Sequence, residues 1–447
     1  MNILVSAYSC EPHQGSERGV GWNLVKAIAK EHKVWVLTRP DESKAAIEAE
    51  LARHPIPNLT FVYFTLPFWQ NSLKLGQSGA MQLHYYLWQI QAYWVGRKLQ
   101  QQIGFDIVHH VTFVRYSCPS FLSLLPAPFV WGPVGGAESA PIAFWKDFSW
   151  KSKCYETARL LWRWVGEIDP FTRLTARNSA LAYAVTNETK QRLEALGAAN
   201  IALLPAIALQ EDEIEQLSHH QPDDCLPLRF LSIGRLLHWK GFHLGLEAFA
   251  RAELSDAEYW VIGDGPERKR LEALAQSLGI THQIKFWGEQ PRQSVLEAIG
   301  RCRALVHPSL HDSGAGVCLE AMAAARPVIC LDLGGPAHQV TERTGLKVAA
   351  HSPEQTIREL ADAMQQLASD DKLCSALGRN AQTRIRDAYS WVTRGEQLNA
   401  AYRTLAEPTV RRAERPKAQK LKAQNLVAQN LTAQKLKAQK AKSSKTI

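Results

Sequence analysis

Short apolar runs that alternate with helical segments constrain the fold of this chain more than any other feature. Before residue 205, the apolar runs with the length of a buried strand are Ile3–Ala7, Lys33–Leu37, Thr60–Phe64, Ile107–His109, Phe129–Trp131 and Ala182–Thr186. A second alternation extends from Phe230 to about Val348. Strands that are separated by helices form parallel sheets with helices on both faces. The sequence therefore predicts an α/β chain with two doubly wound, Rossmann-like domains.

The domain boundaries are predicted from composition. Residues 1–205 and 228–388 form the two domains, and residues 206–227 form a linker because they are rich in Asp, Glu, Gln, His and Pro. A last helix is predicted over 389–407. Residues 408–447 are a basic, low-complexity tail in which leucine recurs every five residues. Five residues turn a helix about 140° beyond a full turn, so these leucines form no stripe and we expect the tail to be disordered.

The net charge of +9 belongs to the tail and not to the domains. From Arg411 onward there are eleven Lys and Arg and one acid, which leaves 41 of the 52 basic and 42 of the 43 acidic residues for the rest of the chain. Domains without a net positive charge lack the electrostatic footprint of a nucleic-acid-binding protein. We therefore expect no nucleic-acid partner, and at most a weak attraction of the tail to anionic lipid.

Several features predict a protein that stays in the cytoplasm. No apolar run approaches the roughly 20 residues of a membrane-spanning helix. The segment Met1–Tyr8 lacks the basic start of a signal peptide and is typical of a buried first strand. The eight cysteines show neither CxxC nor His-paired zinc spacing, so we expect most of them to be small core residues, without disulfides or a structural metal.

The most informative motif is a glycine-containing loop before a short helix in the second domain. Asp312 lies in the loop, the helix is expected to begin near Val317, and Glu320 lies within the helix. Gly314 and Gly316 remove side chains where backbone N–H groups and the positive end of the helix could meet a phosphate or a hydroxyl-rich ligand. The pattern therefore favours a site for a sugar nucleotide.

Two acids at this spacing resemble a motif of retaining glycosyltransferases of family 4. Three further segments follow the order and spacing of that family, namely Phe230–Phe242, Trp260–Pro266 and Ile284–Gly288. The resemblance covers roughly residues 228–390. It implies the GT-B architecture, in which two Rossmann-like domains face each other across the cleft that holds the donor.

The resemblance also implies roles for individual residues. Arg235 and Lys240 would hold the donor diphosphate and stabilise its developing charge in place of a metal ion, so no cofactor or metal is expected. Asp312 would orient the donor sugar, Glu320 would bind the ribose, and the base would pack near Gly288. The loop that carries the two glycines, and the helix start at Val317, would complete this binding site.

Two positions depart from the family pattern. Asp312 stands where the family usually has glutamate, one methylene longer, and Ala325 stands where it usually has glycine. The shorter side chain of Asp312 affects how far its carboxylate reaches toward the donor and therefore which sugar is preferred. Neither change affects the predicted fold.

The first domain contributes a second glycine loop. Gly15 and Ser16 precede a helix, and their backbone N–H groups could reach the donor phosphate from the opposite wall of the cleft. The alternative is a capped turn with Ser16 as the N-cap. No GxxxxGK[ST] motif is present, so phosphoryl transfer from ATP has no support.

A histidine pair in the first domain resembles the segment that carries the catalytic histidine in these enzymes. The family histidine usually lies five residues after an aspartate, but here Val111 holds that position relative to Asp106. His109 and His110 come just before it. We predict His110 as the catalytic residue, because neighbouring residues of a strand point to opposite faces. The alternative is a hydrogen-bonded core histidine.

Features that bear on the acceptor are more open. Gly135 and Gly136 could let an acceptor approach the backbone and Glu138 could bind a hydroxyl, although a plain turn explains them equally well. Residues 80–100 form a strongly apolar helix, and residues 145–164 mix tryptophans with Lys and Arg. Basic residues beside tryptophan are typical of an interfacial membrane face, and the alternative is ordinary core plus a solvated face.

Together these features predict a hexosyltransferase-type enzyme (EC 2.4 class) that moves a sugar from a nucleoside-diphosphate donor to a glycan or lipid-linked acceptor. The resemblance implies retention of the anomeric configuration. We expect a cytoplasmic protein, with peripheral contact to anionic lipid at the inner face of the plasma membrane as an open question. The alternatives are a sugar-nucleotide epimerase or hydrolase of the same fold, and a non-catalytic binding protein.

Overall fold

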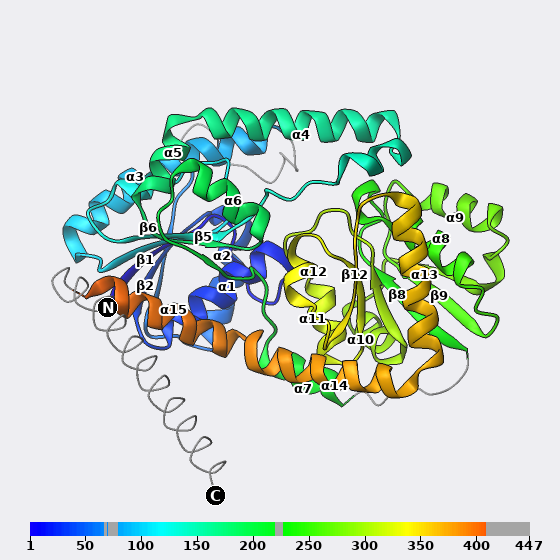
Figure 1. The fold of residues 1–447 in the computed structure, drawn as a ribbon. Coiled ribbons are helices and arrows are strands. Elements are labelled where there is room, and N and C mark those ends of the chain that lie inside the picture. Colours follow the sequence, from blue (N-terminus) through cyan, green and yellow to red (C-terminus); the bar gives the residue numbers. More distant parts are fainter. Residues whose placement is uncertain (67–68, 70–78, 220–226, 408–447) are drawn as a thin grey trace, which may run out of the picture. The chain divides into compact units, whose positions relative to one another are not determined.

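The structure is a computed structural model that describes residues 1–66, 69, 79–219 and 227–407 (Figure 1). The basic tail over 408–447, predicted to be disordered, lies outside the described residues. Met1–Leu398 form one compact unit, which contains both sheets.

The first sheet has seven parallel strands in the order β3-β2-β1-β4-β5-β6-β7 (Figure 1). The strands are β1 (Asn2–Ala7), β2 (Lys33–Thr38), β3 (Leu59–Tyr63), β4 (Ile107–Thr112), β5 (Phe129–Val134), β6 (Ser179–Ala184) and β7 (Ile201–Leu203). Each of the six apolar runs of the first domain coincides with a strand. The seventh strand, β7, has three residues and was not predicted, because so short a segment shows no period.

The longer helices of this half are α1 (Ser16–Ala29), α2 (Pro40–Arg53), α3 (Gly79–Ile103), α4 (Trp150–Ile168), α5 (Pro170–Asn178) and α6 (Asn187–Leu196). The predicted apolar helix over 80–100 lies within α3, which buries Tyr85, Trp88 and Ala92 against the sheet. Two 3-10 helices, η2 (Phe121–Leu124) and η3 (Ile142–Asp147), connect these elements.

The second sheet has six parallel strands in the order β10-β9-β8-β11-β12-β13. They are β8 (Leu228–Ile233), β9 (Ala257–Ile262), β10 (Ile284–Gly288), β11 (Ala304–His307), β12 (Val328–Leu331) and β13 (Gly345–Val348). The helices are α8 (Phe242–Ala252), α9 (Arg268–Ser277), α10 (Arg292–Arg301), α11 (Gly316–Ala323), α12 (Gly334–Gln339), α13 (Pro353–Ser369), α14 (Asp371–Ala388) and α15 (Trp391–Ala406), with η4 (His238–Lys240) and η5 (Thr281–Gln283). The prediction of two Rossmann-like α/β domains is therefore confirmed.

Alternate residues of the second sheet face two different cores, as a sheet covered on both faces requires. Phe230 packs in the cluster that includes residues of α8, α9 and α13, whereas its neighbour Leu231 packs in the cluster that includes residues of α7 (Glu211–Ser218), α10, α11 and α14. Five of the seven described cysteines are buried.

The structure differs from the predicted boundaries at two places. The segment 206–227 contains helix α7, whose Ile214 and Leu217 are buried in the second core. A capping box formed by Gln210 and Glu213 begins this helix. The helix was not predicted, because the polar composition of the segment is also typical of a linker. Conversely, Phe144 and Phe148 of the segment 1–205 pack in the core of the second sheet.

The topology places one switch point in each sheet. The strand order reverses between β1 and β4 in the first sheet and between β8 and β11 in the second. In open α/β sheets, ligands bind outside the carboxyl ends of the strands at such points. The loops after β1, β4, β8 and β11 are therefore the places to look for a site.

Candidate functional site

A charged cluster lies at the switch point of the second sheet, in the loop after β11. The Oδ2 atom of Asp312 forms a salt bridge with Lys240 and lies 3.2 Å from Nε2 of His307. The Oδ1 atom of Asp312 accepts hydrogen bonds from the backbone N–H groups of Gly314, at 3.3 Å, and Ala315, at 3.2 Å. Two of the predicted site residues, Lys240 and Asp312, therefore come together, and His307 was missed.

Local geometry brings the two loops of this cluster into contact. Lys240 ends η4, and the next residue, Gly241, has a positive φ of 66°. A Cβ atom on Gly241 would lie 1.9 Å from the carbonyl oxygen of Pro308, so only glycine lets the loop after β8 approach the loop after β11 so closely. The N–H of Leu310 donates to the carbonyl of Trp239 at 2.8 Å and joins the same two loops.

The electrostatics of the cluster keep Asp312 ionised. Burial acts to raise the pKa of Asp312, but the contact with His307 and the charge of Lys240 outweigh burial and hold this pKa well below its ordinary value. Burial lowers the pKa of His307. The side chains of Lys240 and Asp312 keep exposed fractions of 21% and 15%, so a ligand can reach both.

Arg235, the second predicted cation, follows β8 and Gly234 directly. Its side chain is exposed. Among the described residues, no hydrogen bond or ion pair engages its guanidinium group. Arg235 is therefore available to a ligand, whereas the ammonium group of Lys240 is already paired with Asp312 and would divide its contacts between Asp312 and an anionic ligand.

Glu320 lies on α11 and has a partner that the sequence did not reveal. Its Oε1 atom is 2.8 Å from Nη1 of Arg292 on α10, and Nη2 of Arg292 is 3.2 Å from Oε1 of Glu213. Burial raises the pKa of Glu320, while the charge of Arg292 acts in the opposite direction. A hydroxyl-bearing ligand at Glu320 would therefore meet a carboxylate that Arg292 already orients.

The glycines near α11 do not all leave open space. A Cβ atom on Gly314 would lie 2.7 Å from Cδ1 of Ile207, so the space that this glycine leaves is filled by a protein side chain and not held for a ligand. The corresponding distance for Gly316 is 3.5 Å, an ordinary contact. The helix begins at Gly316, one residue before the predicted start at Val317, after Ala315 with a φ of 43°.

The predicted base-packing residue Gly288 ends strand β10. Its φ is 69°, and its carbonyl accepts a hydrogen bond from the N–H of Gly263 at 2.8 Å. The preceding residue, Trp287, is 45% exposed. This hydrogen bond joins the loops after β9 and β10, at the same carboxyl-end edge of the second sheet as the charged cluster.

In the first domain, the glycine loop after β1 leads into α1 as predicted. Gly15 occupies the N-cap position and Ser16 is the first residue of the helix, so the alternative of Ser16 as the N-cap is wrong. A Cβ atom on Gly15 would meet no atom within 4 Å. The space that a side chain at Gly15 would occupy is therefore open.

The histidine pair at the end of β4 is buried. Nε2 of His109 lies 2.6 Å from the carbonyl oxygen of Gly132, and Nε2 of His110 lies 3.2 Å from the hydroxyl of Tyr85 on α3. Burial lowers the pKa of His109 to about 4, and burial together with His109 lowers that of His110 to about 3. These surroundings are those of hydrogen-bonded core histidines, and the catalytic role of His110 stays a prediction.

Glu138, in the loop after β5, binds hydroxyl groups of the protein itself. Its Oε2 atom accepts from Oγ of Ser313 at 2.7 Å, and its Oε1 atom accepts from Oγ1 of Thr186 at 2.7 Å and of Thr189 at 3.1 Å. Gly136 donates its N–H to the same carboxylate at 3.1 Å. Because Ser313 follows Asp312, Glu138 holds the glycine turn of the first domain against the charged loop of the second.

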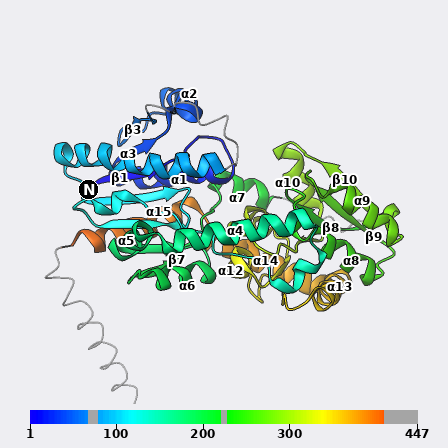
Figure 2. The ribbon, with the colours of Figure 1, turned by 90° about the horizontal axis from the view of Figure 1, so that it is seen from above.

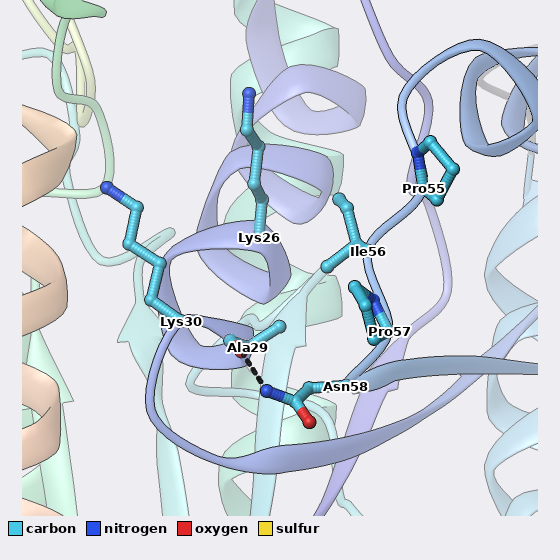
Figure 3. Close-up of a pocket in the computed structure, with 7 residues that line it drawn as sticks. All are labelled: Lys26, Ala29, Lys30, Pro55, Ile56, Pro57 and Asn58. Carbon is cyan, nitrogen blue, oxygen red and sulfur yellow. Dashed lines mark hydrogen bonds between the residues drawn. The ribbon is translucent and has the colours of Figure 1, made fainter.

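A hollow elsewhere on the surface is lined by residues from α1 and the segment before β3. It is formed by Lys26, Ala29, Lys30, Pro55, Ile56, Pro57 and Asn58 (Figure 3). Asn58 donates from Nδ2 to the carbonyl of Ala29 at 3.2 Å. Because this hollow lies where α1 ends and β3 begins, it is at the edge of the sheet opposite to the carboxyl ends of the strands.

The segment that contains the charged cluster has known relatives. Residues 223–384 match the family "Glycosyl transferases group 1". This match includes Arg235, Lys240, Asp312 and Glu320. The chain is also similar to curated proteins whose names describe glycosyl transfer.

Two such relatives are informative. A D-inositol 3-phosphate glycosyltransferase of Corynebacterium urealyticum is 34% identical over 183 residues, which cover 39% of this chain and 42% of that protein. The lipopolysaccharide core biosynthesis glycosyltransferase LpsE of Rhizobium meliloti is 32% identical over 170 residues, which cover 36% of this chain and 47% of that protein. The chain thus matches less than half the length of these relatives.

Solved structures resemble the whole fold. Sucrose-phosphate synthase from Thermosynechococcus elongatus has a TM-score of 0.60 at 18% identity and covers 90% of this chain and 98% of its own. HepE from Anabaena, in complex with UDP and glucose, has a TM-score of 0.56 at 17% identity and covers 90% and 99%. At these identities the likeness shows the fold, which is the predicted GT-B arrangement of two Rossmann-like domains.

Proposed function

We propose that the chain is a glycosyltransferase that moves a hexosyl group from a nucleoside-diphosphate donor to a glycan or lipid-linked acceptor. The observation that carries this proposal is the contact between Lys240 and Asp312 at the switch point of the second sheet, with Arg235 unpaired on the same loop as Lys240. Both loops lie in the segment that matches group 1 glycosyl transferases. The UDP and glucose bound to HepE, a protein of the same fold, support a sugar nucleotide as the donor.

Each charged group has a separate task in this proposal. Arg235 and Lys240 bind the donor diphosphate, and Asp312 accepts hydrogen bonds from hydroxyls of the donor sugar. Glu320, oriented by Arg292 at 2.8 Å, binds the ribose. Charge-assisted hydrogen bonds of this kind contribute roughly 1.5–3 kcal/mol each.

The reaction replaces one bond at the anomeric carbon. The bond from this carbon to the phosphate oxygen breaks and leaves its electron pair on the diphosphate, while the acceptor hydroxyl oxygen bonds to the carbon. The acceptor proton passes to the departing phosphate, so attack occurs on the same face and the configuration is retained. Stabilisation of the diphosphate charge by Lys240 and Arg235 is the main catalytic effect, and it removes the need for a divalent metal ion.

The outer face of α4 supports a membrane-bound acceptor. This helix faces the protein with Ser152, Glu156 and Arg163. Its exposed side carries large apolar residues, of which Trp150 is 71% and Leu161 is 60% exposed. A helix on a protein surface normally turns its apolar side toward the core. Helix α4 has the opposite orientation, with polar residues facing the protein and apolar residues facing outward.

Several of these exposed apolar residues follow a helical spacing and lie on one side of α4. Within one stripe of α4 lie Trp150, Leu161, Trp164, Val165 and Ile168, with Lys151 exposed beside them. No other described element lies over α4 in the view from above (Figure 2). Tryptophan and lysine side by side suit the headgroup region of an anionic membrane, so we place the protein at the inner face of the plasma membrane in polysaccharide or glycolipid synthesis. No helix of the described residues is long and apolar enough to span a bilayer.

A donor screen tests the proposed reaction. UDP-, GDP- and ADP-sugars are incubated with the protein in EDTA, with and without glycan and lipid acceptors, and products are separated by chromatography. We expect one donor class to bind and its sugar to move to an acceptor. Release of free sugar at equal rates with and without acceptor would indicate a hydrolase, a changed sugar an epimerase, and binding without turnover a binding protein. Loss of all binding in EDTA would contradict the metal-independent mechanism.

Vesicle flotation tests the proposed membrane face. We expect binding to vesicles of one-third phosphatidylglycerol in phosphatidylcholine, weaker binding to pure phosphatidylcholine, and loss of binding in Leu161→Glu. Val392→Glu, at another exposed apolar position, is the matched control. A dimer without vesicles that Leu161→Glu dissociates would show that a second copy covers this face, and would refute the membrane proposal.

A further inference from the structure

The inner face of α4 carries a carboxylate that contacts both loops of the charged cluster. Oε1 of Glu156 lies 3.0 Å from Nε2 of His238 and 3.3 Å from Nε2 of His311. His238 lies two residues before Lys240, and His311 lies immediately before Asp312. One side chain therefore joins the loop that supplies the cation to the loop that supplies the acid.

The carboxylate of Glu156 is almost completely enclosed and fully engaged. Its exposed fraction is 1%, and its Oε2 atom lies 3.3 Å from Nη1 of Arg159. Burial acts to raise the pKa of Glu156, but the contacts with His238, His311 and Arg159 outweigh burial and lower it. A buried charge is costly unless partners satisfy it, so the three partners and Glu156 depend on one another.

Aromatic stacking reinforces the same junction. The ring of Trp239 lies between two parallel rings, Tyr155 of α4 at a centroid distance of 5.4 Å and His311 at 5.1 Å. The interplanar angles are 9° and 15°. Rotation of α4 would therefore disturb the loop after β8 and the loop after β11 together.

The helix also binds the glycine turn after β5. Arg159 donates from Nη2 to the carbonyl oxygen of Glu138 at 2.5 Å, and Arg163 donates from Nη1 to the same oxygen at 3.2 Å. The carboxylate of Glu138 in turn binds Ser313, next to Asp312. Helix α4 is thus connected by polar contacts to the turn of the first domain and to both loops of the cluster.

We infer that Glu156 is a positioning residue that sets the placement of Lys240 relative to Asp312 through His238 and His311. The inference rests on the proposed function, because it assigns Glu156 to the geometry of the donor site and not to contact with the donor. Glu156 touches neither Lys240 nor Asp312 in the described contacts, and its partners are one and two residues away from them. Its loss should therefore impair the chemical step more than it impairs the binding of the nucleotide.

The main experiment compares Glu156→Gln with wild type and with Thr157→Ala, a change at the exposed neighbouring position. Gln keeps the volume of the side chain and removes its charge. We expect Glu156→Gln to lower kcat at least about tenfold while the affinity for UDP, measured by calorimetry, changes less than about threefold. Thr157→Ala should match wild type in both. A kcat within twofold of wild type for Glu156→Gln would overturn the inference.

Hydrogen exchange gives a readout that does not depend on turnover. In Glu156→Gln, amide exchange should accelerate in both segments 235–242 and 307–316, because both loops lose the same partner. In Glu138→Gln it should accelerate mainly in 307–316, because Glu138 contacts only Ser313 of these loops. Unchanged exchange in both segments of Glu156→Gln would overturn the inference.

A milder variant covers the case in which Glu156→Gln does not fold. Tyr155 is 51% exposed, so Tyr155→Ala should fold, and it should accelerate exchange in 235–242 and lower kcat by a smaller factor. Wild-type exchange in Tyr155→Ala would count against the junction. If wild type turns over no sugar nucleotide, the proposed function fails, while faster exchange in both loops of Glu156→Gln would still support the positioning role of Glu156.

Discussion

Strands β4 and β11 hold equivalent places in their sheets, each at the switch point, yet the buried histidines at their ends have different partners. Those of β4 are enclosed, with His109 bound to the carbonyl of Gly132 and His110 to Tyr85. His307, which ends β11, lies 3.2 Å from Asp312, whose carboxylate also contacts Lys240. The same topology thus presents neutral core groups in one domain and a charged, ligand-accessible pair in the other.

This difference indicates how the two domains divide their work. A charged donor needs cations at a partly open edge. In the proposed function the second domain supplies them through Arg235 and through Lys240, which is paired with Asp312. The first domain would contribute backbone groups at Gly15, the carboxylate of Glu138 and the inward face of α4. We expect substitutions in the second domain to affect chemistry and those at β4 to affect stability.

Replacement of Lys240 should have the largest effect. Lys240→Ala removes a cation that the proposal places at the departing diphosphate, so we expect kcat to fall by roughly 10²–10³-fold, as is typical when one preorganised donor is lost. Lys269→Ala, an exposed lysine on α9, is the matched control and should keep wild-type turnover. Steady-state kinetics at saturating donor measure the effect, and circular dichroism checks the fold. Undiminished turnover in Lys240→Ala would remove the basis of the proposed mechanism.

Replacement of Glu320 should have an intermediate effect with a different signature. In the proposed function Glu320→Gln weakens a hydrogen bond to the ribose, and this bond would be equally strong in the ground state and the transition state. We expect KM for the donor to rise roughly tenfold while kcat changes less than about threefold. Glu297→Gln, exposed on the neighbouring helix α10, should leave KM unchanged. A fall in kcat at constant KM would instead place Glu320 at the reacting sugar.

Much of the fold and part of the site could be predicted from the sequence. Continuous apolar runs located the strands because a strand covered on both faces admits no polar alternation. Lys240 and Asp312 could be assigned to one donor site because their segments resemble motifs of one glycosyltransferase family. The contact of Glu156 with His311 could not be predicted, because 155 positions separate the two residues and no local sequence pattern marks either of them. The proximity of Ile207 to Gly314 could not be predicted, because glycine next to a ligand and glycine next to a side chain look alike in sequence.

Replacement of His110 tests the comparison between strands β4 and β11 most directly, and it has the smallest expected effect on turnover. Burial and the neighbouring His109 lower the pKa of His110 to about 3 in the folded chain, whereas an unfolded histidine titrates near 6.5. Between these values the unfolded state binds a proton that the folded state excludes, so stability falls as pH drops from about 6.5 toward 3. At pH 5 this one residue should cost about 2 kcal/mol relative to pH 7.5.

His110→Gln should remove that share of the pH dependence, because an amide does not titrate and can still bond to Tyr85. Denaturant unfolding at pH 7.5 and pH 5 measures the difference, and His282→Gln, exposed in η5, should leave it unchanged. We expect kcat of His110→Gln at pH 7.5 to stay within about threefold of wild type. A fall of a hundredfold without a change in the pH dependence of stability would support His110 as the catalytic histidine.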